Sequence, residues 1–100
     1  MIYGLKDEVV EAICKTFQAH PEIEKVILYG SRAKGNFKPA SDIDLTFLAP
    51  SLDQTGLNKI SWELDELLLP FTFDLSIYSQ INNPDLLDHI ERVGTLFYSK

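Results

Sequence analysis

The sequence predicts an α+β domain, in which helices pack on one face of a small mixed β-sheet and leave an open cleft on the other face. In three segments, apolar residues recur at helical spacing, and each segment ends at a proline or a glycine. Three short runs between them are either continuously apolar or alternate between apolar and polar residues, as strands do. A chain of 100 residues can bury one modest core, so we expect a single domain over residues 1–100.

The first predicted element is an amphipathic helix over residues 5–19. One stripe of this helix is apolar: Leu5, Val9, Ala12, Ile13 and Phe17. The helix ends at His20, because Pro21 disfavours the helical conformation for the residue before it. Cys14 is typical of a small buried hydrophobic residue, since no activating base lies near it in the sequence.

A buried strand is predicted over residues 25–29, an apolar run bounded by charge and by Gly30. Gly30 and Ser31 turn the chain, and Ser31 is placed to cap a short helix over residues 32–35. A glycine lets a phosphate approach the backbone closely, and N–H groups at a helix start favour anions. The turn is a candidate phosphate cradle, although a Gly-Ser pair alone indicates only a strand-to-helix turn.

Two carboxylates, Asp42 and Asp44, lie on the second predicted strand, residues 42–48. The apolar residues that alternate with them face the core, so both acids point to the other face of the sheet. Aspartate is rare in strands, and two neighbouring carboxylates repel each other unless a cation lies between them. A divalent metal that takes oxygen ligands, such as Mg²⁺, is the candidate.

A second helix is predicted over residues 57–69, and Pro70 stops it. Trp62 on this helix fits either the core or an exposed contact with a partner. Residues 71–78 follow as a third strand, whose alternation places Asp74 on its polar face. If this strand lies beside the strand that carries Asp42, the three carboxylates converge.

The last helix is predicted to begin at Asn83, its N-cap, with Pro84 in the first helical position. Gly94 ends this helix in the C′ role, and residues 95–98 follow as a strand-like tail. His89 falls on the polar side of the helix, so we expect it to be solvated.

Three cations lie beside the candidate phosphate cradle: Arg32, Lys34 and Lys38. Either they neutralise a triphosphate, or they form a solvated basic loop that balances the adjacent acids. We predict that Arg32 and Lys34 contact a nucleotide together with Gly30 and Ser31.

Composition excludes several functional classes. The net charge of −6 argues against a module that binds duplex nucleic acid, which needs a basic face. No apolar run approaches the roughly 20 residues that span a bilayer, and the N-terminus lacks the pattern of a signal peptide. The single cysteine excludes an internal disulfide and fits a reducing compartment. We therefore expect a cytoplasmic protein that does not contact a membrane.

Two motifs carry a family resemblance: Gly-Ser-Arg-Ala-Lys-Gly over residues 30–35 and Ser-Asp-Ile-Asp-Leu over residues 41–45. Together they resemble the nucleotidyltransferase superfamily of the DNA polymerase beta type. They look most like the minimal nucleotidyltransferases, short proteins that pair with a HEPN-domain partner, many as antitoxin and toxin. The resemblance runs from Val26 to Tyr98. It departs at Lys34, where the family often has arginine, because lysine keeps the charge but loses the planar, bidentate fork.

The resemblance implies a metal-dependent enzyme. Asp42, Asp44 and Asp74 would be the catalytic residues and would hold two Mg²⁺ ions, and Asp74 would also accept the proton of the attacking hydroxyl. The Gly30 and Ser31 amides would hold the β- and γ-phosphates of ATP. The implied reaction transfers AMP from ATP to a hydroxyl acceptor, a tyrosine of the HEPN-type toxin, so that the chain acts as antitoxin.

Two other hypotheses stay open. The chain could be a non-catalytic module that binds nucleotide and metal and neutralises its partner by complex formation, although such a module need not keep Asp74. Transfer of a nucleotide to a small molecule is a third hypothesis, against which the absence of an acceptor domain weighs. Larger members of the superfamily carry such a domain, so here specificity is expected to come from a hetero-complex or from a homodimer.

Overall fold

The computed structural model describes residues 2–100 and confirms the α+β class. The elements, in chain order, are α1 (Asp7–Gln18), β1 (Lys25–Tyr29), α2 (Gly30–Lys34), β2 (Ile43–Leu48), α3 (Gln54–Asp65), β3 (Phe73–Ile77), the 3-10 turn η1 (Tyr78–Gln80), α4 (Pro84–Val93) and β4 (Thr95–Ser99). The strands form one mixed sheet in the order β3-β2-β1-β4. β1 is antiparallel to β2 and to β4, whereas β2 and β3 are parallel.

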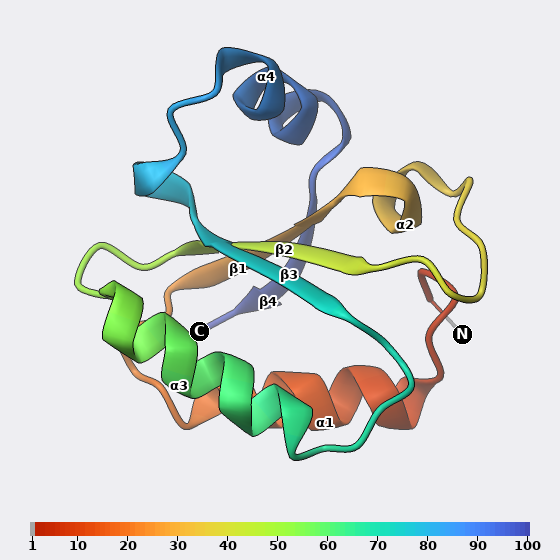
Figure 1. Ribbon diagram of the computed structural model, residues 1–100, viewed down its shortest axis with the longest axis horizontal. Helices are drawn as coiled ribbons and strands as arrows, with labels where there is room; N and C mark the ends of the chain where they lie inside the picture. Colours follow the sequence, from red (N-terminus) through yellow and green to blue (C-terminus); the bar gives the residue numbers. More distant parts are fainter. Residues whose placement is uncertain (1) are drawn as a thin grey trace.

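The sheet separates two groups of helices, whereas the sequence predicted helices on one face only (Figure 1). In Figure 1, α1 and α3 lie on one side of the strands, and α2 and α4 lie on the other. The core lies under the two long helices, where Phe17 of α1 packs edge-on against Phe47 of β2 with ring centroids 5.4 Å apart. Ile43 and Leu45 of β2 are fully buried with Phe47, so the alternation of the strand places Asp44 on the face beneath α2 and α4.

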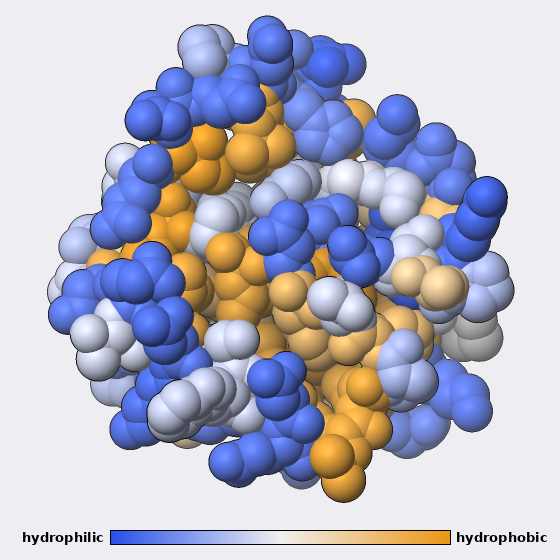
Figure 2. Space-filling model, in the orientation of Figure 1, coloured by the Kyte–Doolittle hydropathy of each residue, from blue (hydrophilic) through white to orange (hydrophobic). Residues whose placement is uncertain are grey.

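β3 forms one edge of the sheet. Figure 2 shows hydrophobic residues gathered in the middle of the face that this edge occupies, with hydrophilic residues around them. Phe73 and Leu75 of β3 are half-buried and pack against the core. Within residues 2–100, no helix is long and apolar enough to cross a membrane.

The bounds of α3 differ from the prediction for a local reason. Asp53 accepts a hydrogen bond from the Gly56 N–H at 2.8 Å, so the helix is capped and begins three residues earlier than expected. It ends at Asp65, and Leu68 beyond it has φ of 56° and is 89% exposed. Trp62, which the sequence could not place, is 73% exposed and so does not belong to the core.

The C-terminal segment is a full strand rather than a tail. β4 pairs with β1 along its length, with a register shift between Val26 and Ile27. Gly94 follows the last residue of α4, as predicted, but its backbone is extended rather than left-handed. A Cβ at this position would collide with the Ile90 carbonyl oxygen, which accepts a hydrogen bond from the Gly94 N–H at 2.7 Å. This close turn holds α4 next to β1.

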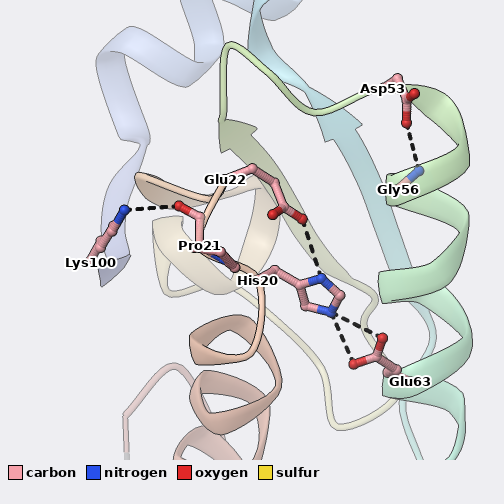
Figure 3. A network of polar contacts seen from close by, with 7 residues as sticks. All are labelled: His20, Pro21, Glu22, Asp53, Gly56, Glu63 and Lys100. Carbon is pink, nitrogen blue, oxygen red and sulfur yellow. Dashed lines mark hydrogen bonds and ion pairs between the residues drawn. The ribbon is translucent and has the colours of Figure 1, made fainter.

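A buried histidine ties the end of α1 to α3, as Figure 3 shows. His20 is 8% exposed, its Nε2 lies 3.0 Å from both carboxylate oxygens of Glu63, and its Nδ1 lies 3.3 Å from Oε1 of Glu22. The two ring nitrogens thus lie against carboxylates from two different segments of the chain. Helix α1 ends at Gln18 with Ala19 as its C-cap, slightly before the predicted end at His20, and the His20 side chain joins the two helices that cover the core.

Candidate functional site

Parallel pairing of two strands brings two of the predicted carboxylates together. Asp44 of β2 and Asp74 of β3 are direct partners in the register, on strands about 4.8 Å apart. Asp42 lies just before β2, which begins at Ile43, one residue later than predicted. Asp42 and Asp74 are exposed, whereas Asp44 is half-buried. The side chains of Asp44 and Asp74 therefore share one face of the sheet, with Asp42 next to them.

The Asp44 carboxyl is the electrostatic centre of this group. Burial is the largest of the causes that raise the pKa of Asp44 from 3.8 to about 6; the charges of Asp74 and then Asp42 act in the same direction, and Arg32 acts in the opposite one. Near neutral pH this carboxylate lies half-buried beside two like charges that the protein does not fully compensate. A bound cation would supply the missing compensation.

Gly30 makes room for that carboxylate. The residue has φ of 75°, in the left-handed region, and a Cβ on it would collide with Oδ2 of Asp44. Helix α2 begins at Gly30 itself, directly after β1, and Tyr29 is the N-cap residue. The predicted capping role of Ser31 is therefore wrong, because Ser31 already lies inside the first turn.

His89, which was predicted to be solvated, contacts this turn from α4. Its Nε2 accepts a hydrogen bond from the Gly30 N–H at 3.1 Å, and its ring packs edge-on against Tyr29 with centroids 6.1 Å apart. Tyr29 is 7% exposed and is the register partner of Asp44 on β1. Burial raises the pKa of the Tyr29 phenol, and the charges of Asp74 and Asp44 add to this increase. His89 is thus a residue of the site that sequence reasoning missed.

The side chain of Arg32 is buried, and its hydrogen bonds are made within the protein. It is 1% exposed, and its guanidinium lies over the rings of Phe37 and Phe71, at 5.3 and 5.0 Å from their centroids. It donates hydrogen bonds of 2.9 to 3.2 Å to three carbonyl oxygens: those of Tyr3, Pro39 and Ser41. These contacts favour a role in fixing the loop between α2 and β2 over the predicted contact with phosphate.

The other predicted nucleotide contacts lie on α2. Ser31 is half-buried in the first turn, one residue after the glycine that faces Asp44. Lys34 is the last residue of α2 and is exposed, as is Lys38 in the loop that follows. The structure therefore groups Gly30 and Ser31 with the acids, and places Lys34 at the far end of the short helix.

A comparison of the sequence with models of known protein families identifies the family of this chain. The model of the family described as polymerase beta, nucleotidyltransferase matches residues 11–100, a range that includes the three acids and the Gly30 turn. The chain belongs to this family. Among curated proteins, none matches the chain significantly.

Solved structures share the fold of this nucleotidyltransferase. A chain in the crystal structure of a toxin–antitoxin with AMP-PNP is 22% identical, with a TM-score of 0.74 over 91% of this chain and 73% of that chain. A chain of the toxin–antitoxin MntA-HepT is 20% identical, with a TM-score of 0.69 over 95% and 74%. A chain of the tri-AMPylated Shewanella oneidensis HEPN toxin in complex with MNT antitoxin is 19% identical, with a TM-score of 0.70 over 96% and 74%. The predicted nucleotidyltransferase fold is thereby confirmed.

The acids of this nucleotidyltransferase fit a cation that arrives with a nucleotide. Among residues 2–100, no three histidine, cysteine or acidic side chains are already gathered as a metal-ligand set. Mg²⁺ keeps several waters and takes only one or two protein carboxylates beside substrate phosphates. Asp44, with Asp74 across the strand pair and Asp42 two residues earlier, supplies three carboxylates, enough for two such ions that share a ligand. The donor set suits a substrate-associated metal rather than a resident structural one.

Replacing Asp44 with asparagine is expected to raise the melting temperature of the metal-free protein by a few degrees at pH 8 and by less at pH 5. Folding raises the pKa of this carboxyl from its usual 3.8 to about 6, so the folded state binds the proton more tightly than the unfolded state does. The wild-type protein therefore loses stability as the pH rises from about 4 through about 6, and asparagine avoids this loss.

Thermal melts in EDTA at the two pH values measure this difference. Glu91→Gln, a change of one exposed carboxylate on α4, is the control and should show no such pH-dependent gain. A melting temperature of Asp44→Asn at pH 8 that equals or falls below that of the wild type would contradict the electrostatic account of the site.

Proposed function

We propose that this nucleotidyltransferase transfers AMP from ATP to a hydroxyl group, a tyrosine of a HEPN-type toxin, and so acts as the antitoxin. The observation that carries the proposal is the pairing of Asp44 with Asp74 beside the Gly30 turn, in a chain of the nucleotidyltransferase family. Two structures of the same fold support it: one contains AMP-PNP, and the other contains a tri-AMPylated HEPN toxin in complex with MNT antitoxin.

The three acids would have two roles in the transfer, metal binding and acceptance of a proton. Asp44 would bind Mg²⁺ with Asp42 and Asp74, and the ions would neutralise the triphosphate and lower the pKa of the acceptor hydroxyl. The acceptor oxygen forms a bond to the α-phosphorus, the bond from that phosphorus to the bridging oxygen breaks, and pyrophosphate leaves. Asp74, which is exposed, accepts the proton of the hydroxyl.

The turn and α2 would hold the rest of the triphosphate. The Gly30 N–H already donates to His89, so the contribution of Gly30 is the close approach that a missing Cβ allows. The Ser31 amide and hydroxyl would then contact the β- and γ-phosphates, and the exposed Lys34 would add a positive charge.

The partner would complete the site in a hetero-complex. The β3 edge, with half-buried Phe73 and Leu75, offers it an apolar surface and a strand edge. We place the reaction in the cytoplasm, where reducing conditions keep a free thiol such as that of Cys14 reduced.

Intact-protein mass spectrometry tests the proposal. A HEPN-domain protein encoded beside this chain is purified alone and then incubated with the chain, ATP and Mg²⁺, in parallel with the Asp42→Asn, Asp44→Asn double variant. We expect the partner to gain mass in steps of one AMP with the wild type only. No gain in mass, with a stable complex still formed, would overturn the transferase proposal in favour of neutralisation by complex formation.

A further inference from the structure

We propose that His89 is a positioning residue for the Asp44 carboxylate. Through its hydrogen bond to the Gly30 N–H, it fixes the peptide against which that carboxylate rests. The consequence for metal binding rests on the proposed function, in which Asp44 is a metal ligand, whereas the contact between His89 and Gly30 does not.

The first step is the contact itself, which joins α4 to the junction of β1 and α2. Nε2 of His89 lies 3.1 Å from the Gly30 nitrogen and can accept its hydrogen only when Nε2 carries no proton. The geometry therefore assigns the neutral ring with its proton on Nδ1. The ring stands edge-on to Tyr29, at an interplanar angle of 80°, so two separate contacts set its position.

The second step is the need for such a contact. The first N–H groups of a helix have no acceptor within that helix, and Gly30 is the first residue of α2. A glycine also has access to more backbone conformations than any other residue, so its own covalent structure does not select φ of 75°. His89 supplies the missing acceptor and thereby holds the Gly30 peptide in one orientation.

The third step connects Gly30 to Asp44. Oδ2 of Asp44 occupies the space that a Cβ of Gly30 would fill, so the two residues are in direct contact. If the Gly30 peptide turned, the surface against which the carboxylate rests would turn with it. His89 therefore acts on Asp44 through the backbone, and it does so from α4, a different element from those that carry the acids.

Two substitutions separate the hydrogen bond from the packing of the ring. His89→Gln keeps an acceptor near the position of Nε2 but loses the ring, whereas His89→Phe keeps a ring beside Tyr29 but has no acceptor. Glu91→Gln, an exposed change on the same helix, is the matched control. If His89→Phe does not fold, His89→Leu replaces it as the variant without an acceptor.

Binding of Mn²⁺ alone, followed by the electron paramagnetic resonance signal of the free ion at one fixed pH, gives the main readout. Groups that orient metal ligands typically change metal affinity by 10- to 100-fold, and we expect about tenfold weaker binding for His89→Phe because His89 acts through the backbone. His89→Gln and Glu91→Gln should bind within about threefold of the wild type, well inside that range. Wild-type affinity in His89→Phe, or an equal loss in His89→Gln, would overturn the proposal.

If the wild-type protein itself binds no Mn²⁺, the assigned metal role of Asp44 fails, and NMR of the metal-free protein then decides the positioning role. We expect a scalar coupling between the Gly30 nitrogen and Nε2 of His89, and a ¹³C shift of the Asp44 carboxyl that moves in His89→Phe but not in His89→Gln. Absence of the coupling, or an unmoved Asp44 shift in His89→Phe, would overturn the inference.

Discussion

Replacing Asp44 with asparagine is expected to abolish nucleotidyl transfer while the fold stays intact. Asparagine keeps the shape of the side chain and its place against Gly30, but it removes the anionic oxygen that a hard cation needs. A metal at a phosphoryl-transfer site supplies several kcal/mol of transition-state stabilisation, so we expect a rate at least about a thousandfold lower. The measurement is single-turnover transfer of labelled AMP from ATP to the HEPN partner.

The controls follow from the same site. Asp42→Asn should be equally inactive, whereas Asp53→Asn should keep wild-type activity, because Asp53 caps α3 and asparagine is an equally good cap. Full activity of Asp42→Asn or of Asp44→Asn would refute the mechanism. Asp44→Asn is thus expected to lose activity and to gain stability in the metal-free state. Such a result would mean that the electrostatic repulsion among the three acids is kept at a cost in stability because metal binding needs all of their charges.

The face of the sheet to which the acids point could be predicted, because it follows from the alternation of apolar and polar residues along one strand. Ile43 and Leu45 are apolar and buried, so Asp44 between them must point away from the core. The alternation alone predicted the convergence of Asp44 and Asp74 only on the condition that their strands are neighbours, because it does not determine strand order or register. The chain crosses from β2 to β3 through α3, and such a crossover makes the two strands parallel.

Two side chains show why residue type alone did not identify the site. Arg32 lies in a motif that indicates phosphate binding, but the carbonyl oxygens that bind it come from the N-terminal segment and from a loop. His89 lies three residues after Leu86 and four before Val93, so it falls on the apolar stripe of α4. That spacing was the available indication that His89 faces the protein, whereas its partner, Gly30, could only come from the fold.

Replacing Arg32 with methionine is expected to destabilise the protein by about 3 kcal/mol or more, because three carbonyl oxygens lose the hydrogen bonds of a buried, charged donor. Methionine fills much of the same volume, so the loss reports the hydrogen bonds and the contacts with the aromatic rings rather than a cavity. Arg32→Lys should recover little, since a single ammonium cannot reproduce the planar array of donors. Urea unfolding at pH 7 measures the free energy of unfolding of both variants.

Lys34→Met, two residues further along α2, separates the two roles that the sequence left open for these cations. Lys34 is exposed, so its loss should change the free energy of unfolding by no more than about 0.5 kcal/mol while weakening the binding of AMP-PNP. A variant Arg32→Met that is as stable as the wild type but binds AMP-PNP poorly would restore the original prediction of a phosphate contact. The structure favours the opposite result, because Arg32 bonds to Ser41, one residue before Asp42, and so fixes the loop that leads to the acids.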